Sequence, residues 1–445
     1  MIPRSRLRSP LLCALCLLCI GVSKVSAQGL EVLHKDLDRL AQEVESQVIE
    51  WRRDFHQHPE LSNREFRTAK IVAEHLTQLG MDVQTRVAHT GVVGILRGKP
   101  GGPVVALRAD MDALPVTEEV DLPFASKVRT TYNGQEVGVM HACGHDAHTA
   151  ILMAVASTLS QVRSRLPGTV KFIFQPAEEG APTGEQGGAG LMVKEGVLEN
   201  PAPSAIFGLH VGPNRPWRTI GYRAGGMMAS ADTLRIVVRG RQTHGAMPWN
   251  GVDPIVVSAQ VVMALQTIPS RQVPLTTAPV VVTIGSIHGG VRSNIIPDKV
   301  EMIGTIRTLD REMRQDIHQR VKRTVVKIAE SAGAEAEVSI QGGVPITYND
   351  PELTTQMTPT LERVAGQSGV DTNMSPVTGA EDFSCYQEQI PGLYVILGTA
   401  PKDADPETLA PLHSPWFCLD ESTLIVGVRA LSNLAVDYLS MQSDN

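Results

Sequence analysis

The feature that most constrains the fold is an alternation of short apolar runs with amphipathic segments along most of the chain. The apolar runs lie at residues 103–109, 170–175, 205–209 and 393–397, and the helical patterns at 31–54, 64–79 and 146–162. Each apolar run has the length and composition of a strand that is buried on both faces. Strands that alternate with helices predict an α/β domain whose central sheet is flanked by helices.

The middle of the chain has a different order of elements. Patterns typical of strand, helix, strand, strand, helix and strand follow one another at residues 233–239, 253–267, 280–287, 299–307, 310–331 and 336–340. This βαββαβ order is that of a ferredoxin-like sandwich. Because the α/β pattern resumes afterwards, we expect two domains: a catalytic domain in two parts, 28–224 and 341–445, and an inserted satellite domain, 225–340.

The first 27 residues have the three parts of a secretory signal. Three arginines precede an apolar run at 11–22, and a Val-Ser-Ala site precedes Gln28. The apolar run is too short to span a bilayer, so an uncleaved membrane anchor is the weaker alternative. We therefore expect removal of residues 1–27 and a secreted or periplasmic protein that has no membrane attachment afterwards.

Composition limits the classes of partner. Of the 445 residues, 42% are hydrophobic and 20% are charged, as in ordinary globular proteins. The net charge is −7 and no block of lysine and arginine stands out, so we expect no nucleic-acid-binding surface. Three cysteines follow the signal, Cys143, Cys385 and Cys418. An odd number leaves at least one free, metal-bound or intermolecular, and the pairing of Cys385 with Cys418 stays open.

Side chains able to bind metals follow three of the predicted strands. Asp112 comes just after the first apolar run, Glu178 and Glu179 after the second, and His210 after the third. Open α/β sheets bind ligands beyond the carboxyl ends of their strands. We therefore expect these side chains to meet at one edge of the sheet.

Cysteine, histidine and glutamate together make a donor set for two divalent ions with open positions for water. The candidate ligands are Cys143, His145, Glu179, His210 and His413. Each signal has a structural explanation by itself, because a Cys-Gly-His segment or a lone histidine is common in cores and adjacent glutamates are common on surfaces. Their joint occurrence favours the metal site, since several independent coincidences would otherwise be needed.

Three motifs carry most of the remaining information: Arg-Ala-Asp-Met-Asp-Ala-Leu-Pro at 108–115, Met-His-Ala-Cys-Gly-His-Asp-Ala-His at 140–148, and Gln-Pro-Ala-Glu-Glu-Gly at 175–180. They resemble the aminoacylase/carboxypeptidase G superfamily, and within it the branch of hippurate hydrolases and plant auxin–amino-acid conjugate hydrolases. Further matches follow in the same order at 208–211, 243–248, 293–298, 379–383 and 412–415. The resemblance therefore covers nearly all of the chain after the signal.

The resemblance implies a dinuclear metal centre. Its ligands would be Cys143, His145, Glu179, His210 and His413, with the sulfur of Cys143 shared. Zinc and manganese are the expected ions, and a mixed donor set also accepts cobalt and nickel. Glu178 would be the general base, close to the ions but not bound to them, and Asp112 would orient a ligand through a hydrogen bond.

The resemblance also implies how the substrate is held. His244 would stabilise the tetrahedral oxyanion, supplied by a partner subunit or by domain closure. Asn294 matches the family motif for contact with the substrate carboxylate, and Arg292 and Arg307 are further candidates for that contact. By analogy with the family, we expect a homodimer or a larger homo-oligomer formed through the satellite domain.

The implied reaction is hydrolysis of the amide bond of an N-acyl or N-aroyl amino acid, such as a hippurate-like or N-acetyl conjugate. A metallo-carboxypeptidase or dipeptidase with the same machinery is the nearest alternative, and a catalytically inactive binding protein is the second. Glu178 and the intact ligand set argue against the second alternative. Trp249 and the long loop at 181–186 depart from the family pattern and leave the acyl specificity open.

Overall fold

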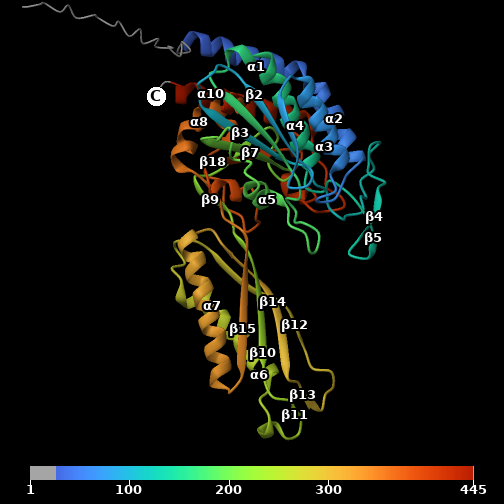
Figure 1. Cartoon of the computed structure of the whole chain (residues 1–445), viewed down its shortest axis with the longest axis vertical. Helices are drawn as coiled ribbons and strands as arrows, with labels where there is room; N and C mark the ends of the chain where they lie inside the picture. The colour runs from blue at the N-terminus through green and yellow to red at the C-terminus, as the bar shows by residue number, and fades with distance from the viewer. Residues whose placement is uncertain (1–26, 444–445) are drawn as a thin grey trace, which may run out of the picture.

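The computed structural model describes residues 27–443, so the expected signal lies outside the described residues apart from its last residue. Figure 1 shows two bodies, a larger one in which helices surround a sheet and a smaller, elongated one built on a four-stranded sheet. Each body has its own hydrophobic core. This mixed α/β architecture with a second, smaller body confirms the predicted fold class.

The central sheet of the larger body has eight strands. In spatial order they are β1 (Asp82–Val87), β2 (Gly91–Arg97), β6 (Thr169–Gln175), β3 (Val104–Asp110), β7 (Ala205–Gly212), β18 (Gly392–Gly398), β8 (Ile220–Gly221) and β17 (Val370–Asp371). The strands β6, β3, β7 and β18 run parallel, whereas β1, β2 and β8 each have an antiparallel neighbour. The carboxyl ends of the four parallel strands therefore meet at one edge of the sheet.

Helices surround this sheet, as Figure 1 shows. They are α1 (Ala27–Glu43), α2 (Glu45–Gln57), α3 (Phe66–Gln78), α4 (His145–Gln161), α5 (Gly188–Lys194), α8 (Pro351–Ala365), α9 (Ser384–Gln387) and α10 (Leu424–Ser443). Within residues 27–443, Glu421–Ser443 is the one helical segment long and apolar enough to cross a membrane, and 83% of its apolar window is buried. Since α10 packs against α4 and α8, it is the core helix of the larger body.

The smaller body follows the predicted βαββαβ order. Its elements are β10 (Ala231–Arg239), α6 (Pro254–Leu265), β12 (Val280–Gly289), β14 (Lys299–Thr308), α7 (Arg311–Ser331) and β15 (Glu335–Val344). The strands pair antiparallel in the order β12-β14-β10-β15, and the two helices pack against each other. A buried residue recurs every fourth position along α7, from Met313 to Ala329, which gives that helix one apolar stripe facing the sheet.

Short strand pairs mark the two ends of the smaller body. At the end near the eight-stranded sheet, β9 (Gly225–Met228) pairs with β16 (Thr347–Asn349) where the chain enters and leaves. At the far end, β11 (Thr243–His244) pairs with β13 (Ile295–Ile296). Figure 1 shows that β11 and β13 form the tip most remote from the larger body. A hairpin of β4 (Arg129–Tyr132) and β5 (Gln135–Gly138) projects from the larger body.

Candidate metal centre

The five predicted ligands converge in the larger body. Ligand atoms of Cys143, His145 and His210 lie within 4.8 Å of one another, and so do those of Cys143, Glu179 and His413. Cys143 belongs to both groups, which is the position that a shared sulfur requires. A third group of the same size joins His145 to the pair of glutamates at 178 and 179.

Gly144 brings two of these ligands to the same place. Its φ is +85°, and a Cβ at this position would lie 2.3 Å from Cγ2 of Val211. Only glycine accommodates both the left-handed backbone and the close approach. Helix α4 begins at His145, so the turn at Gly144 places Cys143 directly ahead of the helix and next to His145.

His145 has one nitrogen in use and one without a partner. Its Nδ1 lies 3.2 Å from Oδ1 of Asp112. Its Nε2 is buried, has no hydrogen-bond partner among residues 27–443, and lies 4.0 Å from both Glu178 Oε2 and Glu179 Oε1. Burial would lower the pKa of His145, but the carboxylates of Asp110 and Asp112 raise it to about 10. A divalent cation beside Nε2 would displace the proton held there.

His210 and Cys143 face each other. Sγ of Cys143 lies 3.4 Å from Nε2 of His210, whose Nδ1 lies 2.7 Å from the Val211 carbonyl oxygen. Burial holds the pKa of His210 well below its ordinary value, which favours the neutral ring that binds metals. Burial, followed by the charges of Glu179 and Glu178, raises the pKa of the Cys143 thiol. A bound cation would reverse that effect, because a coordinating thiol is deprotonated.

One expectation about His210 is wrong. The sequence pattern ended the strand at residue 209, but β7 extends to Gly212 because it pairs with β18 as far as Gly398. His210 is therefore a strand residue, and its side chain still reaches the cluster.

His413 is the most exposed of the five candidate ligands. Its side chain is 53% exposed, and its Nε2 lies 3.1 Å from Oε1 of Glu179.

Asp112 is a buried carboxylate that contacts several residues of the metal centre. Besides His145, it accepts hydrogen bonds from the backbone N–H groups of Glu178 and Glu179, at 3.1 Å each, and from the Ser62 hydroxyl at 2.7 Å. One buried carboxylate thus orients a candidate ligand ring and the turn that carries both glutamates. The contact with His145 is of the kind that the resemblance implied for Asp112.

A buried ionic network behind Glu178 had no assigned role in the sequence analysis. Arg108, which is fully buried, contacts Asp110 at 2.7 Å and both Glu381 and Asp382 at 3.0 Å. The Asp382 N–H donates to Oε1 of Glu178 at 3.3 Å. Burial, and then the charges of Glu381 and Asp382, raise the pKa of Glu178 well above its ordinary value. Arg108 was the one residue from which this network could have been predicted, because an arginine in a buried strand requires carboxylate partners.

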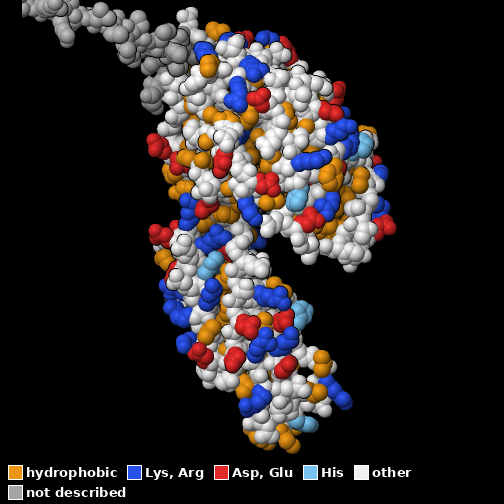
Figure 2. All heavy atoms as spheres, viewed as in Figure 1, with side chains coloured by type: hydrophobic (Ala, Val, Ile, Leu, Met, Phe, Trp, Pro, Cys, Tyr) orange, Lys and Arg blue, Asp and Glu red, His pale blue; other side chains and the backbone are white. Residues whose placement is uncertain are grey.

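The predicted substrate-binding residues lie in the smaller body. His244 and Asn294 lie together at its tip, where the Gly245 N–H donates to the Asn294 carbonyl oxygen at 2.8 Å. Arg292 lines a hollow beside them. Arg307 lies near the other end, in β14, where its Nε donates to the Thr305 hydroxyl. The structure therefore does not bring these residues to the metal cluster, and Figure 2 shows an open gap between the two bodies on one side.

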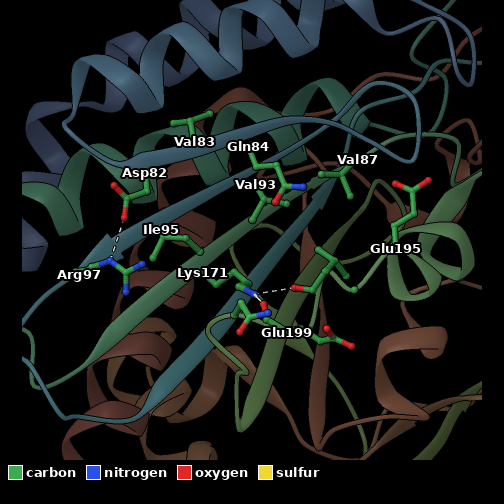
Figure 3. A pocket seen from close by; sticks show the side chains of 13 residues that line it. Asp82, Val83, Gln84, Val87, Val93, Ile95, Arg97, Lys171, Glu195 and Glu199 are labelled. Atoms are coloured by element: carbon green, nitrogen blue, oxygen red, sulfur yellow. Dashed lines mark hydrogen bonds and ion pairs between the residues drawn. The ribbon is translucent and has the colours of Figure 1, made fainter.

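A separate cavity of about 220 Å³ lies against the central sheet and is lined by none of the predicted ligands (Figure 3). The ammonium group of Lys171 donates there to the carbonyl oxygens of Val197 and Glu199, at 2.8 and 2.6 Å. Burial lowers the pKa of Lys171 to about 8. Lys171 thereby fastens the segment after α5 to the sheet, which is a structural role.

The residues of the cluster fit divalent metal ions. Within the described part of the chain, His145 Nε2 is a buried nitrogen without a hydrogen-bond partner, and the donor atoms of the cluster are sulfur, nitrogen and carboxylate oxygen. Cys143, His145, Glu179, His210 and His413 would hold the ions.

Comparison with known proteins also indicates a metal-dependent hydrolase. The family described as "Peptidase family M20/M25/M40" matches residues 106–437. Thermostable carboxypeptidase 2 of Saccharolobus solfataricus is 41% identical over 398 residues, which cover 89% of this chain and 96% of the relative. N-acetylcysteine deacetylase of Bacillus subtilis is 40% identical over 395 residues, which cover 88% of this chain and 97% of the relative.

A solved structure extends the likeness to three dimensions. The Bacillus subtilis YXEP protein, described as a dinuclear metal binding peptidase from the M20 family, matches with a TM-score of 0.74 and 38% identity. The match covers 89% of this chain and 99% of that chain. The chain therefore belongs to peptidase family M20/M25/M40 and is a metal-dependent hydrolase of amide bonds.

Proposed function

We propose that the protein is an exported amidohydrolase that cleaves N-acyl or N-aroyl amino acids into a carboxylic acid and an amino acid, with Glu178 as the general base. The observation that carries the proposal is the position of the Glu178 carboxylate, which lies beside the ligand cluster, 4.0 Å from His145 Nε2. Export rests on the signal expected at residues 1–27. The amidohydrolase class is supported by the similarity to N-acetylcysteine deacetylase of Bacillus subtilis.

Two divalent ions held by the five candidate ligands would polarise the amide carbonyl and lower the pKa of the attacking water. Glu178 takes a proton from that water and later gives it to the departing amine. Its surroundings favour proton transfer to the amine, because burial, and then the charges of Glu381 and Asp382, raise the pKa of Glu178 above its ordinary value.

His244 has the tautomer that an oxyanion donor requires. The Ala246 N–H donates to its Nδ1 at 3.0 Å, which leaves the ring proton on the exposed Nε2. Nε2–H would donate to the tetrahedral oxyanion once the tip of the smaller body reaches the metal cluster, by closure or from a second subunit. Asn294 and Arg292, at the same tip, would bind the carboxylate of the amino-acid part.

The test combines metal content with turnover. Mass spectrometry of the purified protein should give the mass of a chain that begins at Gln28. Metal analysis of the same protein should give close to two divalent ions per chain. Hippurate and N-acetyl amino acids should release free amino acid in a chelator-sensitive reaction. Glu178→Gln should keep both ions and lose about 10²- to 10⁴-fold in kcat, as expected for loss of a general base. Glu136→Gln, in an exposed ion pair with Arg129, is the matched control.

The results separate the alternatives. Faster hydrolysis of dipeptides than of their N-acylated forms would establish the carboxypeptidase or dipeptidase activity that the Saccharolobus solfataricus relative suggests. Full metal content without turnover on any of these substrates would establish the binding protein. Undiminished turnover in Glu178→Gln would refute the proposed mechanism.

A further inference from the structure

Two buried carboxylates hold the turn that carries Glu178 and Glu179. The N–H groups of these two residues donate to Asp112 at 3.1 Å, and the N–H of Ala177 donates to Oε1 of Glu65 at 2.9 Å. Three consecutive backbone N–H groups thus face two carboxylates, as in the anion-binding nests of other proteins. Ala177 has a φ of +54°, in the left-handed region that residues other than glycine rarely adopt.

Glu65 itself is held in place from several parts of the chain. Its side chain is 0% exposed. It accepts hydrogen bonds from the Asn63 N–H at 3.0 Å and from the Thr90 hydroxyl at 2.5 Å, in addition to the Ala177 N–H. These bonds join the segment before α3 and the turn before β2 to the turn after β6, so the acceptor for Ala177 is preorganised by two other loops.

We propose that Glu65 is a positioning residue for the metal centre. By accepting the Ala177 N–H, Glu65 holds the left-handed turn that directs Glu178 and Glu179 into the cluster. The proposal rests on the proposed function only for the roles of these two glutamates. The hydrogen bonds of Glu65 described above go to Asn63, Thr90 and Ala177, so it acts on the ligands through the backbone.

The alternative is that Glu65 merely joins three loops and contributes to stability. Glu60 offers a control, because it is a half-buried carboxylate that, like Glu65, accepts two backbone N–H groups, those of Arg67 and Thr68 at 2.9 and 2.8 Å. Those two N–H groups belong to α3, which carries none of the predicted ligands. A stability role alone predicts similar behaviour for Glu65→Ala and Glu60→Ala.

The experiment measures metal binding as well as turnover. Affinity for Co²⁺ is measured by competition with a chromogenic chelator, geometry by the visible spectrum of the Co²⁺ protein, and kcat and KM with an N-acetyl amino acid. Glu65→Ala should weaken Co²⁺ binding and lower kcat by about 10- to 100-fold each, with an altered spectrum and a KM within about threefold. Glu60→Ala should lower the melting temperature without changing the spectrum.

Two further variants distinguish positioning from stability. Glu65→Gln keeps an oxygen for the Ala177 N–H while its amide group faces the Thr90 hydroxyl, so its spectrum should match that of the unmodified protein. Ala177→Gly makes the left-handed conformation accessible without an anchor. The double variant Glu65→Ala/Ala177→Gly should therefore recover part of the Co²⁺ affinity that Glu65→Ala loses.

Specific results would overturn the proposal. They are an unchanged Co²⁺ spectrum and affinity in Glu65→Ala, or no recovery in the double variant. If Glu65→Ala is insoluble, Glu65→Asp replaces it, because aspartate keeps the buried carboxyl group but withdraws it from Ala177 by about 1.5 Å; unchanged Co²⁺ binding in that variant would refute the proposal. Because these readouts need no substrate, they stand even if N-acyl amino acids are not cleaved.

Discussion

At the scale of single residues, Gly144 combines two constraints that rarely coincide. Its φ of +85° excludes most side chains, and a Cβ there would lie 2.3 Å from Val211. We expect Gly144→Ala to destabilise the protein by about 2 kcal/mol or more, the sum of backbone strain and overpacking, and to lower metal content. Thermal unfolding and metal analysis of the purified variant measure both effects.

Gly134 separates the two contributions. Its φ is +78°, but a Cβ there meets no atom within 4 Å. Gly134→Ala should therefore show only the backbone effect, about 1 kcal/mol, with unchanged metal content. Equal destabilisation by the two substitutions would contradict the importance of the contact with Val211.

The ligand residues and Asp112 were predictable from the sequence, but Glu65 was not. Cys143, His145 and Glu179 belong to motifs with recognisable chemistry. Glu65 lies between Arg64 and Phe66 in a segment where no metal-binding or catalytic motif was recognised, and its proposed role depends on a hydrogen bond from Ala177, more than a hundred positions away. Contacts of that kind follow from the packing of the finished fold, which neither composition nor local periodicity describes.

At the scale of secondary-structure elements, Asp232 attaches α7 to β10. Arg314 and His318 contact its carboxylate at 2.6 and 3.0 Å. Burial alone would raise the pKa of Asp232, but these two partners lower it from 3.8 to about 2. A carboxylate with a depressed pKa in the folded state stabilises that state above pH 4, and the contribution, about 1 to 2 kcal/mol, is lost as pH falls from 4 to 2.

We therefore expect Asp232→Asn to be less stable than the unmodified protein at neutral pH, with a difference that narrows below pH 4. Chemical denaturation at a series of pH values measures it. Asp316→Asn is the control, because Asp316 lies on the same helix in an i,i+4 pair with Arg320 and is 43% exposed. A difference between Asp232→Asn and the unmodified protein that is constant with pH would contradict the role of the ion pair.

Helices and strands with a continuous hydrophobic pattern were predictable from the sequence, whereas those whose pattern is interrupted were not. The buried strands and the long amphipathic helix α7 appear where the sequence placed them. The helical pattern at 31–54 is two helices, which meet at Val44. Strand β2 was not predicted, because its glycines weaken its strand pattern. Gly94 is needed there because a Cβ would lie 2.8 Å from Leu76 of α3, a constraint visible only after packing.

At the scale of the whole molecule, the reacting groups are divided between two bodies. The metal cluster lies in the larger body, and His244 lies at the far tip of the smaller one (Figure 1). The tip also exposes large apolar side chains: Met247 is 48%, Trp249 75% and Val291 94% exposed. Exposed apolar side chains grouped in this way are typical of a surface that docks on a protein.

The last prediction tests whether that docking joins two copies of the chain. In a dimer whose tips reach across, a subunit with His244→Ala still has Glu178, and a partner with Glu178→Gln still has His244. Each mixed dimer would then contain one complete site, so an exchanged equimolar mixture should recover about a quarter of the unmodified activity. Two His244 variants mixed in the same way should recover none. No recovery in the first mixture, with exchange verified by mass spectrometry, would mean that His244 reaches the metal cluster of its own chain by closure.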